Sequence, residues 1–145
     1  MRRRPADPGE AKRVTEPSHT VHLRNSPGLV EPRGHYSHVA MHRDLAYLSG
    51  QLPIDQHGTP LTDQPFDTQA RQVLENLDHC LTTAGTHRSN LVSVTVYIAD
   101  INNWPTFDAI YADWIGQHRP ARAVAGVAEL HYGSAVEVQA IAALL

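Results

Sequence analysis

Two ionisable residues interrupt strand-like apolar segments in the C-terminal third of the chain. Arg122 begins the segment 122–128, and Glu137 lies within the segment 135–141. A buried guanidinium needs a partner, because breaking a buried ion pair costs about 3–5 kcal/mol. The partner of Arg122 is either structural, with Glu137 on a neighbouring strand as the candidate, or the carboxylate of a ligand gripped by the arginine fork. Glu137 itself is either structural or a general base with a water molecule within reach.

The other reactive side chains favour structural roles. The sequence contains no G-x-S-x-G, H-E-x-x-H, G-x-G-x-x-G or C-x-x-C motif. The single cysteine, Cys80, falls on the apolar stripe of a predicted helix, as a core residue does. His35, His38 and His42 lie close together, but on a strand only His38 and His42 share a face. We expect structural or surface histidines and no metal site.

Charge divides the chain of 145 residues into two parts. Residues 1–18 carry five basic and three acidic residues, whereas residues 19–145 carry seven arginines, twelve acidic residues and no lysine. The missing lysine excludes Schiff-base, pyridoxal-phosphate and P-loop chemistry from the body of the protein. Its acidic balance argues against a nucleic-acid-binding face, which carries clustered positive charge.

Composition also predicts the organisation of the chain. Residues 1–18 hold three prolines, eight charges and little to bury, so we expect a flexible tail before a single domain at 19–145. A single cysteine cannot form an internal disulfide, and no run of apolar residues is long enough for a transmembrane span or a signal peptide. We therefore expect a cytoplasmic protein.

Periodicity predicts the elements that must position Arg122 and Glu137. Apolar residues at helical spacing over 66–84, followed by Gly85, indicate a helix with a glycine C-cap, and a second helix begins near 102–104 with Pro105 in its first turn. Alternating or apolar runs predict strands at 21–24, 36–41, 45–49, 91–98, 122–128 and 135–144. The order β-β-β-α-β-α-β-β indicates an α+β fold with both helices on one face of a mixed sheet, and another subunit covering the opposite face.

Several short motifs follow one another along the chain. They are Gly34-His35-Tyr36-Ser37-His38, Leu48-Ser49-Gly50-Gln51-Leu52-Pro53, the helical run 69–77, the strand and turn 94–104, and Pro120-Ala121-Arg122-Ala123 followed by Val136-Glu137-Val138. Together they resemble the signature of the Rid family, the reactive intermediate deaminases also called YjgF or L-PSP proteins. The resemblance extends from about residue 21 to residue 144.

This resemblance implies a chorismate-mutase-like fold, a homotrimer with clefts between subunits, and hydrolysis of reactive enamines and imines such as 2-iminopropionate. Arg122 would clamp the substrate carboxylate, and Glu137 would orient or activate the attacking water. Tyr36 would line the cleft from the neighbouring subunit, with Ser49 and Gly50 adding polar and backbone contacts. No cofactor is implied, because a protonated imine is already electrophilic and needs mainly positioning.

Three residues depart from the family pattern and bear on the substrate. His35 replaces a proline beside Tyr36, Asp108 stands where deaminases often carry asparagine, and Val124 replaces a frequent cysteine. A carboxylate at Asp108 could repel an anionic substrate. The alternatives are therefore a non-catalytic or specialised member that binds a small carboxylate metabolite, and a ribonuclease or translation inhibitor, against which the acidic body counts.

Overall fold

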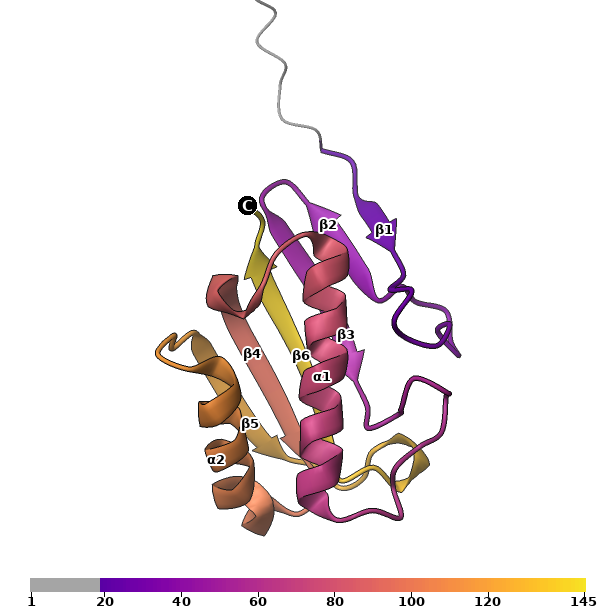
Figure 1. Cartoon of the computed structure of the whole chain (residues 1–145), viewed down its shortest axis with the longest axis vertical. Coiled ribbons are helices and arrows are strands. Elements are labelled where there is room, and N and C mark those ends of the chain that lie inside the picture. The colour runs from indigo at the N-terminus through magenta and orange to yellow at the C-terminus, as the bar shows by residue number, and fades with distance from the viewer. Residues whose placement is uncertain (1–18) are drawn as a thin grey trace, which may run out of the picture.

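The computed structural model describes residues 19–145, which form one six-stranded sheet and two α-helices (Figure 1). The tail expected at residues 1–18 lies outside the described residues. The sheet order is β1-β2-β3-β6-β4-β5, and only the β4–β5 pair is parallel. The strands are β1 (His22–Arg24), β2 (Val39–His42), β3 (Leu45–Gln51), β4 (Leu91–Ile98), β5 (Ala121–Gly126) and β6 (Val136–Ala143). The predicted element order and mixed sheet are confirmed.

The long helix α1 (Phe66–Ala84) ends where the sequence predicts. Gly85 adopts a left-handed conformation with φ 78°, and its N–H donates to the carbonyl of Thr82 while the N–H of Thr86 donates to the carbonyl of Leu81. This is a Schellman motif, which favours glycine because a Cβ is strained at positive φ. The apolar stripe of α1 is buried and includes Cys80. The core position predicted for that thiol is therefore confirmed.

The shorter helix α2 (Trp104–Ile115) carries Pro105 at its N-terminus, also as predicted. A proline suits the first helical turn because its missing N–H would find no partner there. The helix buries Phe107, Ile110 and Tyr111 against the rest of the core. Helix α2 follows a short 3₁₀ turn, η2 (Ile101–Asn103), and two further turns are η1 (Arg88–Asn90) and η3 (His131–Gly133).

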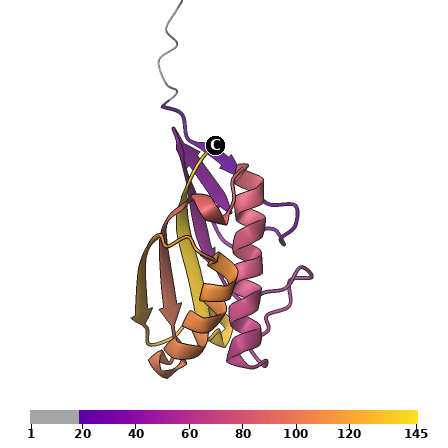
Figure 2. The same cartoon turned by 60° about the vertical axis from the view of Figure 1, so that its left-hand side comes forward.

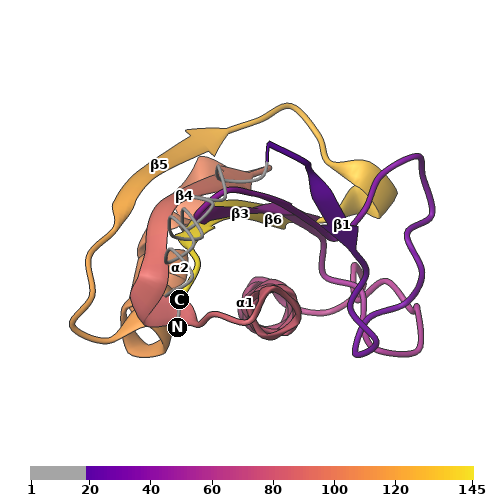
Figure 3. The ribbon, with the colours of Figure 1, turned by 90° about the horizontal axis from the view of Figure 1, so that it is seen from above.

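Both helices cover the same face of the sheet, which curves around them (Figures 2 and 3). This face carries the valine-rich core of β4 and β6, for example Val94, Val96 and Val138, each fully buried. The opposite face carries alternate residues such as Tyr47, Thr95 and Gln139, which remain partly or fully exposed. Period-two alternation in β4 and β6 thus separates a core face from an open face. No helix in the described part of the chain is long and apolar enough to cross a membrane.

The segment before β2 differs from the expectation of a strand over 36–41. Strand β2 begins only at Val39, and the preceding residues form a loop tied down by side chains. The backbone N–H of Ser26 donates to Nδ1 of His38 at 3.0 Å, and the N–H of His38 donates to Oδ1 of Asn25 at 3.1 Å. These bonds replace strand pairing before Val39 and leave Tyr36 in the loop. Elsewhere the predicted strand ends differ by at most two residues, and both ends of β4 agree with the predicted strand at 91–98.

Candidate active site

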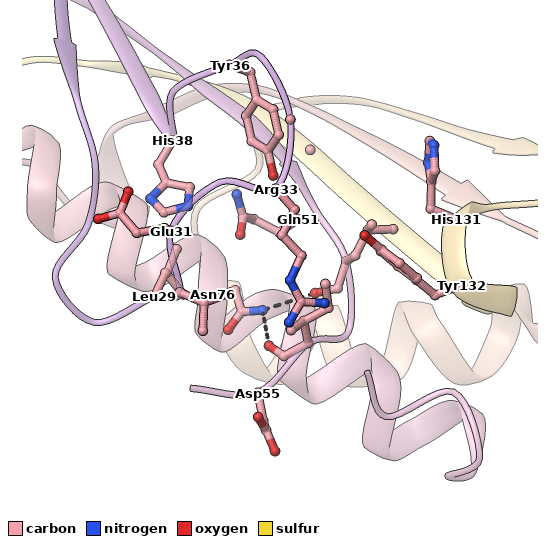
Figure 4. Close-up of a pocket in the computed structure, with 15 residues that line it drawn as sticks. Leu29, Glu31, Arg33, Tyr36, His38, Gln51, Asp55, Asn76, His131 and Tyr132 are labelled. Atoms are coloured by element: carbon pink, nitrogen blue, oxygen red, sulfur yellow. Dashed lines mark hydrogen bonds between the residues drawn. The ribbon is translucent and has the colours of Figure 1, made fainter. Parts of the chain in front are cut away.

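A concave site lies beside the loop that carries Tyr36 (Figure 4). It is a cavity of about 220 Å³ between that loop, the end of β3 with the turn after it, and η3. Tyr36 and Gly50, both predicted site residues, line it together with residues that the sequence did not single out. The latter include Arg33, Gln51, Asn76 and Tyr132.

Helix α1 holds in place the part of the cavity wall that is formed by the turn after β3. Asn76 is 3% exposed, and its side-chain amide donates to the carbonyls of Leu52 and Ile54 at 3.0 and 2.9 Å. Its own Oδ1 accepts a hydrogen bond from Gln72 at 2.8 Å. One buried side chain thus binds two carbonyls of the turn after β3, of which that of Leu52 also accepts the Ile54 N–H, and so holds this turn in place.

Ser49 has a positioning role in this arrangement. Its hydroxyl donates to the carbonyl of Ser37 at 2.5 Å, and its backbone N–H donates to the carbonyl of His38. Ser49 is absent from the cavity that Tyr36 and Gly50 line, and it lies instead at a shallow depression on the open face of the sheet. It holds the Tyr36 loop against β3.

Glu137 lies directly against Gly50. A Cβ built on Gly50 would collide with Oε1 of Glu137, so only glycine leaves room for that carboxylate. Burial raises the pKa of the half-buried Glu137, and the nearby His131 opposes the rise only in part. Within residues 19–145 nothing donates a hydrogen bond to this carboxylate. A carboxylate of raised pKa without a protein donor is suited to hold and deprotonate a water molecule.

Tyr36 belongs to the same cluster. The pKa of its hydroxyl is raised by burial first, and then by the neighbouring Tyr132 and by the negative charge of Glu137. The ring is 52% exposed, so it forms part of an open wall. Tyr36, Gly50 and Glu137 therefore come together in one chain, and we refer to them as the Glu137 cluster.

Arg122 lies in a different place. Its Nη1 donates to Oδ1 of Asp108 at 3.0 Å, and its guanidinium stacks 4.9 Å from the ring centre of Trp104 and 4.7 Å from that of Tyr111. We refer to Trp104, Asp108, Tyr111 and Arg122 as the Arg122 cluster. Glu137, the candidate in the structural alternative that the sequence leaves open for Arg122, is not its partner: Asp108, one turn into α2, takes that place.

Strand register explains why Arg122 and Glu137 do not meet. Arg122 pairs with Val94, a fully buried residue on the helix-covered face. Glu137 pairs with Tyr97, which points to the other face because it is three residues further along β4. Val124, two residues after Arg122, shares its face and packs against the core edge. The predicted site residues therefore divide between two clusters on opposite faces of the sheet.

His38 and Cys80 have the structural character that the sequence indicates. His38 is 4% exposed, burial lowers its pKa, and its Nδ1 accepts the Ser26 N–H already described. Burial raises the pKa of Cys80 to about 12, which leaves the thiol protonated and unreactive. In the span 19–145 no group of three or more histidine, cysteine or acidic side chains is placed to hold a metal ion.

The sequence did not reveal the cavity residues Arg33, Asn76 and Tyr132. Arg33 directly precedes the Gly34–His38 motif, and that position is the only local signal. Asn76 is a buried polar residue within the apolar pattern of a helix, which in retrospect marks a side chain with a fixed partner. Tyr132 lies on η3, where it adopts a positive φ of 62°.

Known proteins match this chain over most of its length. The sequence model of the family described as Endoribonuclease L-PSP matches residues 27–144. The human 2-iminobutanoate/2-iminopropanoate deaminase is 35% identical over 122 residues, which are 84% of this chain and 87% of that protein.

Solved structures match equally well. A structure of YyfA from Yersinia pestis, described as a protein of unknown function of the conserved Rid family, is 32% identical with a TM-score of 0.82, covering 86% of this chain and 100% of that chain. The YjgF gene product of E. coli is 27% identical with a TM-score of 0.79, covering 84% and 98% of the two chains. The fold, the motif order and these matches agree, and the chain belongs to the Endoribonuclease L-PSP family, the Rid family whose motifs its sequence resembles.

Proposed function

We propose that the protein is a deaminase that hydrolyses reactive 2-imino acids, such as 2-iminopropionate, to 2-oxo acids and ammonia. The observation that carries this proposal is the Glu137 carboxylate, half-buried at Gly50 and Tyr36 and without a hydrogen-bond donor among residues 19–145. The name of the human relative, a 2-iminobutanoate/2-iminopropanoate deaminase, supports the same reaction.

Each cluster would supply one part of the reaction. The guanidinium of Arg122 would bind the substrate carboxylate through its planar fork, and the stacking on Trp104 and Tyr111 keeps that fork oriented. Glu137 would accept a proton from water as the water oxygen bonds to the imine carbon. The resulting carbinolamine would receive that proton on nitrogen and expel ammonia, while its hydroxyl proton passes to the Glu137 carboxylate and a carbonyl is left. Tyr36 would line the site and limit the orientation of the substrate.

This chemistry requires a second copy of the chain. Because Arg122 and Glu137 lie on opposite faces of one sheet, a single chain cannot present both to one small substrate. A homotrimer would place the Arg122 cluster of one subunit opposite the Glu137 cluster of the next. Closed cyclic symmetry would then produce equivalent shared sites.

A trapping assay tests the proposal. 2-Iminopropionate is generated in situ by an amino-acid oxidase acting on alanine, and the semicarbazone yield in the initial phase measures the imine that the protein has not hydrolysed, because semicarbazide reacts faster with the imine than with the 2-oxo acid. Wild type should reduce the semicarbazone yield, and Glu137→Gln should lower kcat about 100-fold or more, as expected for loss of a general base. Arg122→Met should raise KM about tenfold, while Arg71→Met, an exposed change on α1, should have no effect. An unaltered semicarbazone yield with wild type would refute the proposal.

One observation favours a second candidate, a specialised member that binds a carboxylate without hydrolysis. Asp108 already forms an ion pair with the guanidinium of Arg122, and its negative charge weakens the attraction of that guanidinium for an incoming anion. In that case 2-oxobutanoate would bind in calorimetry while the trapping assay stayed negative. Ribonuclease activity, which the family description mentions, is disfavoured by seven arginines against twelve acids over 19–145.

A further inference from the structure

Arg33 brings a positive charge into the cavity beside the Glu137 cluster. Its Nη2 donates to the carbonyl of Gly58 at 2.5 Å, which fixes one arm of the guanidinium. Gly58 has φ 83°, and a Cβ there would lie 2.7 Å from that same Nη2, so the backbone makes room for the arginine. Figure 4 shows the guanidinium directed toward the middle of the cavity.

No carboxylate within residues 19–145 forms an ion pair with this guanidinium. Among the described residues the ion pairs are Arg88–Asp78 and Arg122–Asp108, and Arg33 takes part in none. The remaining guanidinium donors are therefore available to an external acceptor. Because Arg33 is solvent-exposed, a ligand can reach it without rearrangement of the loop.

The two acidic residues in the cavity wall point elsewhere. Oδ1 of Asp55 accepts hydrogen bonds from the backbone N–H groups of His57 and Thr59, both at 2.9 Å. Figure 4 shows its carboxylate below the cavity, and the carboxylate of Glu31 directed away on the far side, near His38. Neither carboxylate competes for Arg33.

Neutral polar groups complete the surroundings of the guanidinium. The hydroxyls of Tyr36 and Tyr132 belong to the same cavity, and Figure 4 shows that of Tyr132 turned inward. Phenol hydroxyls beside an unpaired guanidinium donate to anionic oxygens. The site is therefore built to receive a carboxylate rather than a cation or a purely apolar group.

We infer that Arg33 binds a second carboxylate, at the end of the substrate side chain, and that the protein prefers 2-imino acids with an acidic side chain. This inference rests on the proposed function. The Glu137 cluster shares Tyr36 and Gly50 with this cavity, so a substrate carbon held at Glu137 directs its side chain toward Arg33. The α-carboxylate remains the partner of Arg122 from the neighbouring subunit.

A comparison of imines tests the preference. The imines of glutamate and alanine are generated by suitable oxidases, and hydrolysis is followed by semicarbazide trapping. We expect kcat/KM at least tenfold higher for the acidic imine in wild type. Arg33→Gln should lower that value about tenfold and leave the alanine imine within twofold. Arg24→Gln is the matched control, because Arg24 is also exposed and also donates to a backbone carbonyl, that of Thr83. Equal rates for the two imines, or an equal loss for both in Arg33→Gln, would overturn the inference.

A binding measurement separates this inference from the reaction itself. Calorimetry compares 2-oxoglutarate with 2-oxobutanoate, which resemble the products of the two imines. Wild type should bind 2-oxoglutarate at least tenfold more tightly, Arg33→Gln should abolish the difference, and Arg33→Lys should retain part of it. If this pattern holds while no imine is hydrolysed, the deaminase proposal fails and the carboxylate site stands. If hydrolysis is observed but the two oxo acids bind alike, Arg33 has no such role.

Discussion

Asp108 competes with the substrate carboxylate for the guanidinium of Arg122, the proposed substrate-binding group. Its Oδ1 lies 3.0 Å from Nη1 of Arg122, so an incoming carboxylate must displace Asp108 or share the fork with it. We predict that Asp108→Asn increases the affinity for a 2-imino acid, because asparagine keeps the shape and hydrogen-bonding capacity of the side chain and removes its negative charge.

The structure limits the size of this effect. The side chain of Asp108 is 47% exposed and that of Arg122 is 23% exposed, so water screens the pair. Such ion pairs contribute about 0.2–1 kcal/mol, and their loss should cost no more stability than that. Relief of the competition therefore lowers KM by about fivefold at most, since about 1.4 kcal/mol corresponds to a factor of ten.

The semicarbazide assay measures the change directly, with KM for 2-iminopropionate determined at low and at high salt. Asp113→Asn is the control, because Asp113 is an exposed carboxylate on the same helix without an ion pair. The fall in KM should appear only in Asp108→Asn and should shrink as salt screens the charges.

An unchanged or raised KM in Asp108→Asn would refute this account of Arg122. It would mean that Asp108 contributes to substrate binding, for example by holding an amine, or that Arg122 does not bind the carboxylate.

Three further predictions concern the Glu137 cluster and its support. Gly50→Ala should reduce kcat at least tenfold by displacing Glu137, and should cause no additional loss in a Glu137→Gln background, as a double-mutant cycle measures. Burial raises the pKa of Glu137 in the folded protein above its ordinary value of 4.5. The stability that this carboxyl group contributes is therefore present below pH 4.5 and is lost as pH rises through its pKa in the folded protein. Glu137→Gln should therefore stabilise the protein in urea unfolding more at pH 7.5 than at pH 4, and an equal effect at both would contradict the burial argument. Asn76→Ala should destabilise the protein by about 1–3 kcal/mol, because the Ile54 carbonyl loses its side-chain donor and the Leu52 carbonyl keeps only the Ile54 N–H, and a change below about 0.5 kcal/mol would contradict that role.

The sequence predicted most of the fold because local patterns determine it. The stripe of α1 and the glycine after it mark both ends of the helix, and Pro105 marks the start of α2. The predicted start of β2 was wrong because side chains of Asn25 and His38 replace the expected strand pairing, and such contacts leave no periodic pattern in the sequence.

The candidate site was predictable by residue type but not by arrangement. Arg122 and Glu137 stand out as charges in apolar strands. Alternation within each strand does not tell whether these two side chains lie on the same face of the sheet, because that depends on the register between the strands. The partner of Arg122 depends on how α2 packs against β5, a tertiary contact across 14 residues. Arg33 lies in a loop without periodicity, so only its contact with Gly58 reveals its direction.

Complementation between two impaired variants tests the central claim, a hydrolytic site shared by two subunits. Arg122→Met and Glu137→Gln chains with different affinity tags are co-expressed, and mixed assemblies are purified on both tags in succession. In a mixed trimer one of the three interfaces pairs an intact Arg122 with an intact Glu137, so we predict about a third of the wild-type kcat/KM for imine hydrolysis. Mixed assemblies no more active than either parent would contradict the shared site.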